Sequence, residues 1–483
     1  MANFHFDLLS PAEMEQVKEA TFQLMERTGS RVYSPEALAL LKAAGAKVSD
    51  TNLVSIPRSL TEKALATAPS KIDIFNRYGD LAMELTGRNS YFGPGVTCPY
   101  FQDPMTLERR LAVKDDVVAT ATVADALKNI DFLMSLCMIS DKTPQLADVH
   151  EVDALLRNSA KPLLTWSFNV DNLKDIIAMA EAVAGSAENL RRKPNIIVYA
   201  EPTTPLAHSK EALEKLMYMA KKGLPLVYSP GMTFGGTAPV TLAGALTIGL
   251  ADVLCGVVIS QLVREGAPII CSSNGGVLDL KSFQAAYGSP EMLLMDGAGT
   301  QMLRSFGIPS FGLAGATDSK TLDAQAAMEV TAEIIADIGM GANLIHDFGM
   351  SDVGMTGSLQ LMVFCEEVAG YARRLTQGFA TDENGFAADV IDEVGPNGNF
   401  LAAQHTFDNF QKELYVPFCG IRQDYNGWLA AGKKTMADRI NEKITHLLKN
   451  HHPEPLNDSV LAKLDGIVTA AEARYERSIE NHQ

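Results

Sequence analysis

Aromatic and acidic side chains follow several short apolar segments of the chain, and together they have the chemistry needed to hold a small cation. A quaternary ammonium has no N–H to donate, so a protein binds it with aromatic ring faces, each contributing roughly 0.5–2 kcal/mol, and with negative charge. We expect Glu201 to supply that charge. We expect the rings to come from Tyr91, Phe92, Trp166, Phe168, Tyr199 and Tyr228. Each ring is also compatible with packing alone.

Polar residues at other segment ends match the needs of a ligand carboxylate. His346 closes the last apolar segment, where a histidine can bind an anion or act as a general base, or can simply be a neutral side chain satisfied by its neighbours. We expect His346 to work with Ser272, Ser273 or Asn274. Asp318 follows a glycine-rich turn and is either a site residue or a helix N-cap.

A metal centre is not expected. Zinc needs three or four converging Cys, His or carboxylate ligands, and only Cys271 and His346, with Glu201 more distant, stand at segment ends. The six cysteines are scattered without a CxxC pair, which is typical of reduced core residues.

Composition excludes several classes of protein. The net charge of −17 argues against a nucleic-acid partner. The apolar stretch Thr241–Val263 is interrupted by glycines and by Asp252, so we expect a buried helix there instead of a membrane span. Met1–Ser10 lacks the basic and apolar regions of a signal peptide, so we expect a cytoplasmic protein.

The elements that must position these residues alternate along the chain. Apolar runs typical of strands buried on both faces are Ser90–Val96, Ile130–Cys137, Pro162–Phe168, Asn195–Tyr199, Leu224–Tyr228, Pro268–Cys271, Ile308–Gly312 and Ala342–His346. Helical patterns lie between them, at Leu146–Ser159, Asp175–Ala184, Lys210–Lys222, Leu242–Glu265, Pro290–Phe306 and Leu322–Ile338, with another starting near Lys114.

Eight parallel strands alternating with helices predict an α/β fold, a TIM (β/α)8 barrel, over residues 89–375. Residues 1–88 form an N-terminal helical preface, and residues 376–483 form a C-terminal helical extension. A doubly wound open sheet is the alternative, although no GxGxxG follows the first strands. In a barrel the strand-end residues named above meet at one face.

Three segments and the preface together resemble the trimethylamine methyltransferase (MttB) superfamily. The segments are YFGPG at 91–95, YSPGMTFGGTAPVTLAGAL at 228–246 and IPSFGLAGATDSKTLDAQAAMEV at 308–330. The resemblance implies a barrel enzyme that moves a methyl group from an amine to the cobalt of a cognate corrinoid protein. The chain contains no pyrrolysine and so resembles the non-pyrrolysine branch, which acts on quaternary amines.

The resemblance implies glycine betaine, proline betaine, carnitine or butyrobetaine as the substrate. We expect glycine betaine first, because several bulky rings should make the site small. The resemblance implies no tightly bound cofactor, because the cobalamin stays on the partner protein. No catalytic side chain is required beyond substrate positioning, with His346 as the candidate if one acts. We also expect a homo-oligomer.

Two other functions are compatible with the sequence. A barrel lyase or aldolase would need a strand-end lysine, and Lys161, Lys193 and Lys281 are not so placed. A betaine-binding barrel without catalysis would bind the amine and transfer nothing.

Overall fold

Parallel strands occupy the centre of the computed structural model, which describes residues 4–95 and 97–480. Four of them pair side by side in the order β9 (Leu163–Thr165), β10 (Ile196–Ala200), β12 (Leu226–Tyr228) and β14 (Ile269–Cys271). Three more pair in the order β17 (Phe311–Leu313), β18 (Leu344–Phe348) and β6 (Tyr91–Pro94). The predicted class, parallel α/β, is confirmed.

Isolated backbone contacts link these two sets of strands. Cys271 forms a parallel bridge to Ser310, and Leu133 forms one to Leu163. The amide of Asp131 donates to the carbonyl of Phe92 over 2.7 Å. Central strand segments that lie side by side are therefore also consecutive in the chain, apart from β18 and β6, the last and the first of them; a doubly wound sheet has a different strand order.

The predicted strand Ile130–Cys137 is not a regular strand. Within it only Leu133 and Cys137 form β-bridges. The carboxylate of Asp131 accepts the amide of Phe92 over 2.8 Å, in the place that a backbone carbonyl would take in a ladder. The predicted strand Ser90–Val96 corresponds to β6, and its last residue is outside the described ones.

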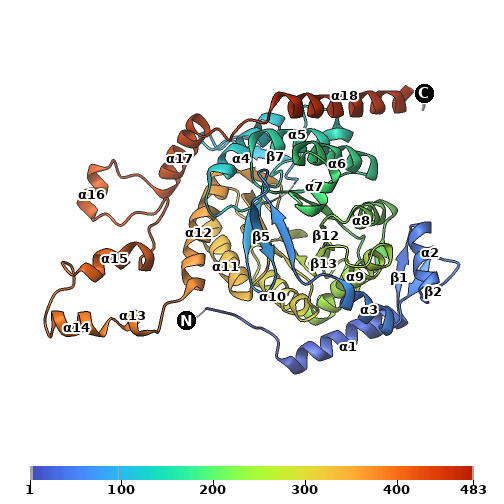
Figure 1. Ribbon diagram of the computed structural model, residues 1–483, viewed down its shortest axis with the longest axis horizontal. Helices are drawn as coiled ribbons and strands as arrows, with labels where there is room; N and C mark the ends of the chain where they lie inside the picture. Colours follow the sequence, from blue (N-terminus) through green and yellow to red (C-terminus); the bar gives the residue numbers. More distant parts are fainter. Residues whose placement is uncertain (1–3, 96, 481–483) are drawn as a thin grey trace.

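Helices surround the strands (Figure 1). They are α4 (Lys114–Ala126), α5 (Ala147–Asn158), α6 (Val170–Ala184), α7 (Ala187–Arg192), α8 (Lys210–Lys222), α9 (Leu242–Val263), α10 (Pro290–Ser305), α11 (Ala324–Met340) and α12 (Leu359–Gln377), with a 3-10 turn at Pro144–Leu146. Our prediction did not include α12. Ser209 caps α8, and α11 is capped by Asp323, five residues after Asp318, which the sequence offered as an N-cap.

Helix α9 is apolar on every side because it is covered on every side. The preface helices α1 (Pro11–Arg27), α2 (Pro35–Ala43) and α3 (Arg58–Thr67) pack on it, as do α8 and α10. It has the length and composition of a membrane span, but most of it is buried inside the protein, as is typical of a core helix in a globular protein.

The remaining preface is a small sheet and a hairpin. Strands β1 (Ser30–Val32), β2 (Lys47–Val48) and β3 (Leu53–Ser55) form one sheet with β11 (Ala207–His208) from the loop after β10, in the order β11-β1-β3-β2. The hairpin of β4 (Ile72–Phe75) and β5 (Leu81–Leu85) lies across one end of the central strands (Figure 1).

Apolar side chains fill the space between the central strands, starting at the end that the β4–β5 hairpin covers. Those from the hairpin are Ile72, Ile74, Met83 and Leu85, and those from the strand segments are Phe132, Met134, Leu164, Ile197, Val227, Ile270, Phe311 and Leu344. This packed cluster fills the interior from the hairpin to Phe311, whose ring also lines the cavity at the carboxyl ends of the strands.

Two further small sheets are built from the loops that follow the strands. One contains β13 (Met232–Phe234), β15 (Gly275–Asp279) and β16 (Gln284–Ala286). The other contains β7 (Tyr100–Gln102), β8 (Arg109–Leu111), β19 (Met350–Ser351) and β20 (Thr356–Ser358). The sequence pattern did not predict either of them.

The C-terminal extension has two parts. An arm of α13 (Glu383–Phe386), α14 (Ala388–Val394), α15 (Gln404–Glu413) and α16 (Tyr425–Ala430) reaches away from the body (Figure 1) and has no buried residue in its helices. The chain then returns, so that α17 (Met436–Asn450) packs on α12 and α4, and α18 (Asp458–Glu480) packs on α6 and α5.

We predict opposite effects for two helical Gly→Ala substitutions. A Cβ at Gly256 in α9 would lie 2.3 Å from the Tyr228 ring, whereas Gly466 in α18 faces open space. Gly256→Ala should therefore destabilise the fold by about 1–3 kcal/mol, and Gly466→Ala should stabilise its helix by up to about 1 kcal/mol. Thermal unfolding midpoints measure both, and a Gly256→Ala midpoint at or above that of the wild type would contradict the packing described.

Candidate functional site

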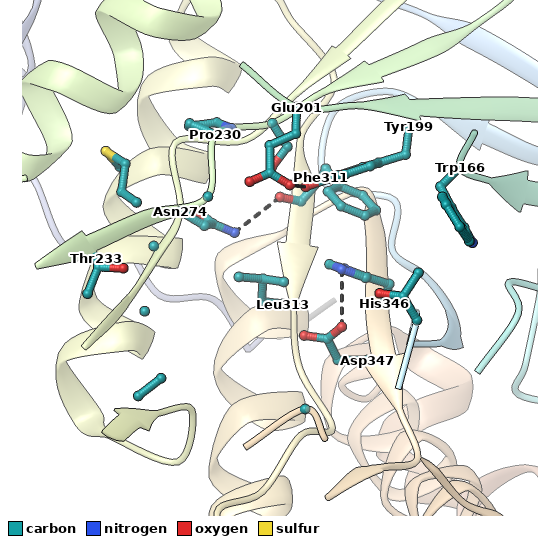
Figure 2. A pocket seen from close by; sticks show the side chains of 18 of the residues that line it. Trp166, Tyr199, Glu201, Pro230, Thr233, Asn274, Phe311, Leu313, His346 and Asp347 are labelled. Atoms are coloured by element: carbon teal, nitrogen blue, oxygen red, sulfur yellow. Dashed lines mark hydrogen bonds and ion pairs between the residues drawn. The ribbon is translucent and has the colours of Figure 1, made fainter. Parts of the chain in front are cut away.

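A cavity of about 610 Å³ opens beyond the carboxyl ends of the central strands. Figure 2 shows its wall from close by. Residues at the ends of six central strands (β9, β10, β12, β14, β17 and β18) contribute, together with the first turns of α8 and the hairpin β15–β16. Its members include Trp166, Tyr199, Glu201, Lys215, Ser229, Gly231, Met232, Thr233, Asn274, Tyr287, Phe311, Leu313, His346, Asp347 and Met350.

Four aromatic residues line the cavity: Trp166, Tyr199, Tyr287 and Phe311. The Phe311 ring stacks on the His346 imidazole, with centroids 4.0 Å apart, and lies 6.0 Å from the Tyr199 ring. Trp166 is held by its indole N–H, which donates to Glu151 over 3.1 Å. The rings are thus fixed by neighbours, which suits the recognition of a cation by ring faces.

Glu201 is the carboxylate beside these rings. The Tyr199 hydroxyl donates to Glu201 Oε2 over 3.0 Å. Burial raises the pKa of Glu201, while the Tyr199 hydrogen bond and the charge of Lys215 lower it. Gly231 makes room for the carboxylate, because a Cβ there would lie 2.0 Å from Glu201 Oε1.

His346 and Asp347 form a buried, uncharged pair in the wall of the cavity (Figure 2). Nδ1 of His346 lies 2.8 Å from the carbonyl oxygen of Gly312, so Nδ1 carries a proton and donates it. Nε2 lies 3.1 Å from Asp347 Oδ1. Burial lowers the pKa of His346 to about 4 and raises that of Asp347 to about 8, so near neutral pH the Asp347 carboxyl donates to an unprotonated Nε2.

Asn274 connects the cavity to a second group of buried acids. Its amide donates to Asp296 Oδ1 and, over 3.4 Å, to the carbonyl of Phe311. Burial raises the pKa of Asp296 to about 6 and raises that of the neighbouring Asp337 well above its ordinary value, an effect that the charge of Asp296 increases. Neither of these two acids lines the cavity, and burial keeps Asp337 protonated near neutral pH, whereas Asp296, with a pKa of about 6, is then largely ionised behind the wall.

Five of the residues that we expected in the site line this cavity, and they come from four different strand ends. These residues are Trp166, Tyr199, Glu201, Asn274 and His346.

Of the remaining expected rings, none lines the cavity. Tyr228 is fully buried behind the wall, where its hydroxyl meets His208 Nδ1 at 2.8 Å. Phe168 lies edge-on against Trp166 and is 41% exposed. The Tyr91 hydroxyl accepts the amide of Glu84 in the hairpin at the opposite end, and Phe92 stacks on Phe348 in the core.

The other expected polar residues support the wall from behind. Ser272 accepts the backbone amide of Asn274 over 3.1 Å. Ser273 is fully buried and packs where Gly249 and Gly299 leave room for it. Asp318 accepts the amide of Tyr287 over 2.8 Å and so positions a cavity residue without lining the cavity itself.

The lining residues that sequence reasoning did not assign to the site include Lys215, Tyr287, Phe311 and Asp347. Phe311 stands inside an expected strand, and its inward direction follows from strand alternation. Lys215 is one turn inside α8, whose start at a strand-end loop places its first turns at the same face. No pattern marks Tyr287, which depends on the unpredicted hairpin β15–β16.

Metal-binding chemistry finds no support in the described part of the chain. Those residues contain no group of three or more His, Cys, Asp or Glu arranged to hold an ion. Cys271 is fully buried and does not line the cavity. Burial raises the pKa of its thiol far above the ordinary value, which keeps it protonated.

Comparison with known proteins gives a match along nearly the whole chain. The family model described as trimethylamine methyltransferase (MTTB) matches residues 2–475. Trimethylamine methyltransferase MttB of Desulfitobacterium hafniense (strain DSM 10664 / DCB-2) is 32% identical over 471 residues, covering 96% of this chain and 94% of that protein. Glycine betaine methyltransferase of Desulfitobacterium hafniense (strain Y51) is 28% identical over 465 residues, covering 96% of each.

Among solved structures, the Methanosarcina barkeri monomethylamine methyltransferase (MtmB) superposes with a TM-score of 0.52. The alignment covers 92% of this chain and 89% of that one, at 12% sequence identity. At this identity the likeness concerns the fold alone.

We predict that Asp347→Asn changes how stability depends on pH. The pKa of Asp347 is raised from 3.8 to about 8, so between these pH values the folded chain holds a proton that the unfolded chain has released. The contribution of Asp347 to the free energy of unfolding therefore falls as the pH rises through that range. The pKa of His346 is lowered from 6.5 to about 4, so its contribution to the free energy of unfolding rises with pH, but only below pH 6.5. The asparagine amide keeps the donor to Nε2 but does not titrate.

The unfolding midpoint of Asp347→Asn should therefore decline less than that of the wild type between pH 6.5 and 8. Chemical unfolding followed by circular dichroism at several pH values measures this. Parallel curves for the two proteins would show that Asp347 is already ionised in the folded wild type.

Proposed function

The chain belongs to the trimethylamine methyltransferase (MTTB) family, and we propose that it takes a methyl group from a small quaternary amine and transfers it to the cobalt(I) of a cognate corrinoid protein. The observation that carries this proposal is the cavity itself. Fixed ring faces surround a space that is also lined by the carboxylates of Glu201 and Glu211, with Glu201 held beside the Tyr199 ring. A permanently charged cation without N–H donors fits those surroundings.

A quaternary amine suits the chain better than trimethylamine for a reason visible in its composition. All 483 residues are of ordinary types, so pyrrolysine is absent. The relative named glycine betaine methyltransferase supports a betaine, at 28% identity. We propose glycine betaine first, followed by proline betaine, carnitine and butyrobetaine.

The proposed reaction needs no acid, base or metal held by this chain. Cobalt(I) supplies the electron pair that bonds to the methyl carbon, the carbon–nitrogen bond breaks, and its pair stays on nitrogen, which leaves as a neutral tertiary amine. The enzyme's residues orient the cation so that one methyl faces outward. Removal from water raises the energy of the cation relative to a transition state in which its charge is being cancelled.

Access to the methyl group fits the position of the cavity. We propose that the strand segments close into a (β/α)8 barrel, supported by the backbone hydrogen bonds that join Phe92 to Asp131 and Leu133 to Leu163. The hairpin β4–β5 plugs one end, so a corrinoid protein would approach at the other end, where the cavity opens.

We also propose a homo-oligomer. Apolar side chains of the arm stand in solvent in the single chain, with Leu401 84% exposed and Val416 75% exposed. Exposed apolar groups gathered on one segment are typical of an interface. Light scattering that gives only the mass of one chain would contradict this.

The test of the proposed reaction is an assay of methyl transfer. Purified protein, a reduced corrinoid protein and a panel of quaternary and tertiary amines are mixed, and the cobalt(I) absorbance is followed. Loss of that absorbance with a quaternary amine is the expected result. Binding of an amine without transfer would indicate a betaine-binding barrel, and no response to any amine would contradict the proposal.

We predict that Glu201→Gln lowers kcat/KM for the quaternary amine about 10- to 100-fold, because it removes the charge while keeping the shape and the hydrogen bond from Tyr199. Glu188→Gln, on the exposed face of α7, is the matched control and should leave kcat/KM unchanged. An unchanged value for Glu201→Gln would mean that the rings bind the cation without this charge.

A further inference from the structure

Lys215 is a positive charge in the wall of the cavity that the proposed methyl transfer does not use. It lies in the second turn of α8 and lines the cavity together with Ser209, Glu211 and Ala212 from the start of the same helix. Its ammonium donates one hydrogen bond, to the carbonyl oxygen of Ser167 over 2.8 Å. Removing a lysine ammonium from water costs free energy of folding unless an opposite charge or hydrogen-bond acceptors compensate it.

The nearby carboxylates do not compensate it directly. Among the described residues, Lys215 has no salt-bridge partner, although the charges of Asp148, Glu201 and Glu211 act on its pKa. Asp148 is occupied by Ser167 Oγ, the amide of Phe168 and Asn172. Glu201 is occupied by the Tyr199 hydroxyl. The ammonium thus retains donors that have no protein acceptor in the described chain.

The cavity therefore carries a cation and an anion that act on each other without touching. Each of Lys215 and Glu201 affects the pKa of the other. A zwitterionic ligand can pair with both charges. Its quaternary ammonium would lie beside Glu201 and the rings, and its carboxylate would accept hydrogen bonds from Lys215. We propose, on the basis of the function proposed above, that Lys215 binds the substrate carboxylate and selects betaines over quaternary amines without an acid group.

His346, which we expected to bind this carboxylate, is poorly suited to it. Both ring nitrogens are already engaged, Nδ1 with the carbonyl of Gly312 and Nε2 with Asp347. The ring is unprotonated near neutral pH, so it offers neither a charge nor a free N–H. An ammonium with free donors is the stronger partner for a carboxylate.

Titration calorimetry tests the proposal separately from catalysis. Glycine betaine is compared with its methyl ester, which keeps the quaternary nitrogen and removes the carboxylate charge. The wild type should bind betaine at least tenfold more tightly than the ester. Lys215→Met should weaken betaine binding roughly 10- to 100-fold and bring the two ligands close together.

Two further variants separate the contact from the fold. Lys215→Arg keeps the charge and should recover part of the preference for betaine. Lys210→Met removes an equal charge from the exposed start of the same helix, where Lys210 pairs with Glu214, and should leave the preference unchanged. If Lys215→Met does not fold, the wild-type comparison of betaine with its ester and the Lys215→Arg result decide the question.

The outcomes distinguish the two proposals. Equal affinity of the wild type for betaine and ester, or a preference for betaine that survives in Lys215→Met, overturns the role of Lys215. A preference that depends on Lys215, combined with no methyl transfer in the cobalt assay, supports the carboxylate site and overturns the proposed reaction.

Discussion

Everything at the cavity depends on how tightly the space between the central strands is packed. Inward side chains such as Phe132, Ile197 and Leu344 meet the β4–β5 hairpin and leave no room at that end. Phe311 is the side chain where this core and the cavity meet, since it belongs to the packed cluster and also lines the open space. A ring fixed by close packing on one side presents a face at a constant position on the other, which preorganises the wall without a loop having to close.

The same burial sets the electrostatics. Removing Asp337 and Asp347 from water makes their ionisation costly, so these two carboxyl groups act mainly as hydrogen-bond donors and acceptors, whereas Asp296 has a pKa of about 6. The charged residues that line the cavity are Glu201, Glu211 and Lys215. Charges of opposite sign at separate places in the wall give a ligand an orientation as well as an affinity.

The alternation of strands and helices was predictable because it rests on local periodicity, and the strand ends that carry Trp166, Tyr199 and His346 followed from it. The direction of a side chain at the end of a strand was not, because one residue decides whether it faces the cavity, as Tyr199 does, or lies behind the wall, as Tyr228 does. Contributions from outside the central strands were also missed: Lys215 comes from a helix, and Tyr287 directly follows the short hairpin β15–β16, which the sequence pattern did not predict.

The way α9 is covered has a consequence for how the chain is made. Its outer face is buried by α1, yet α1 ends at Arg27 and α9 begins at Leu242, more than 200 residues later. During synthesis the preface is made before α9 exists, so the side of α1 that packs on α9 stays uncovered until those later residues have been translated. The docking of the preface onto the body is therefore a late step, which follows the synthesis of the strand-and-helix units that lie between α1 and α9.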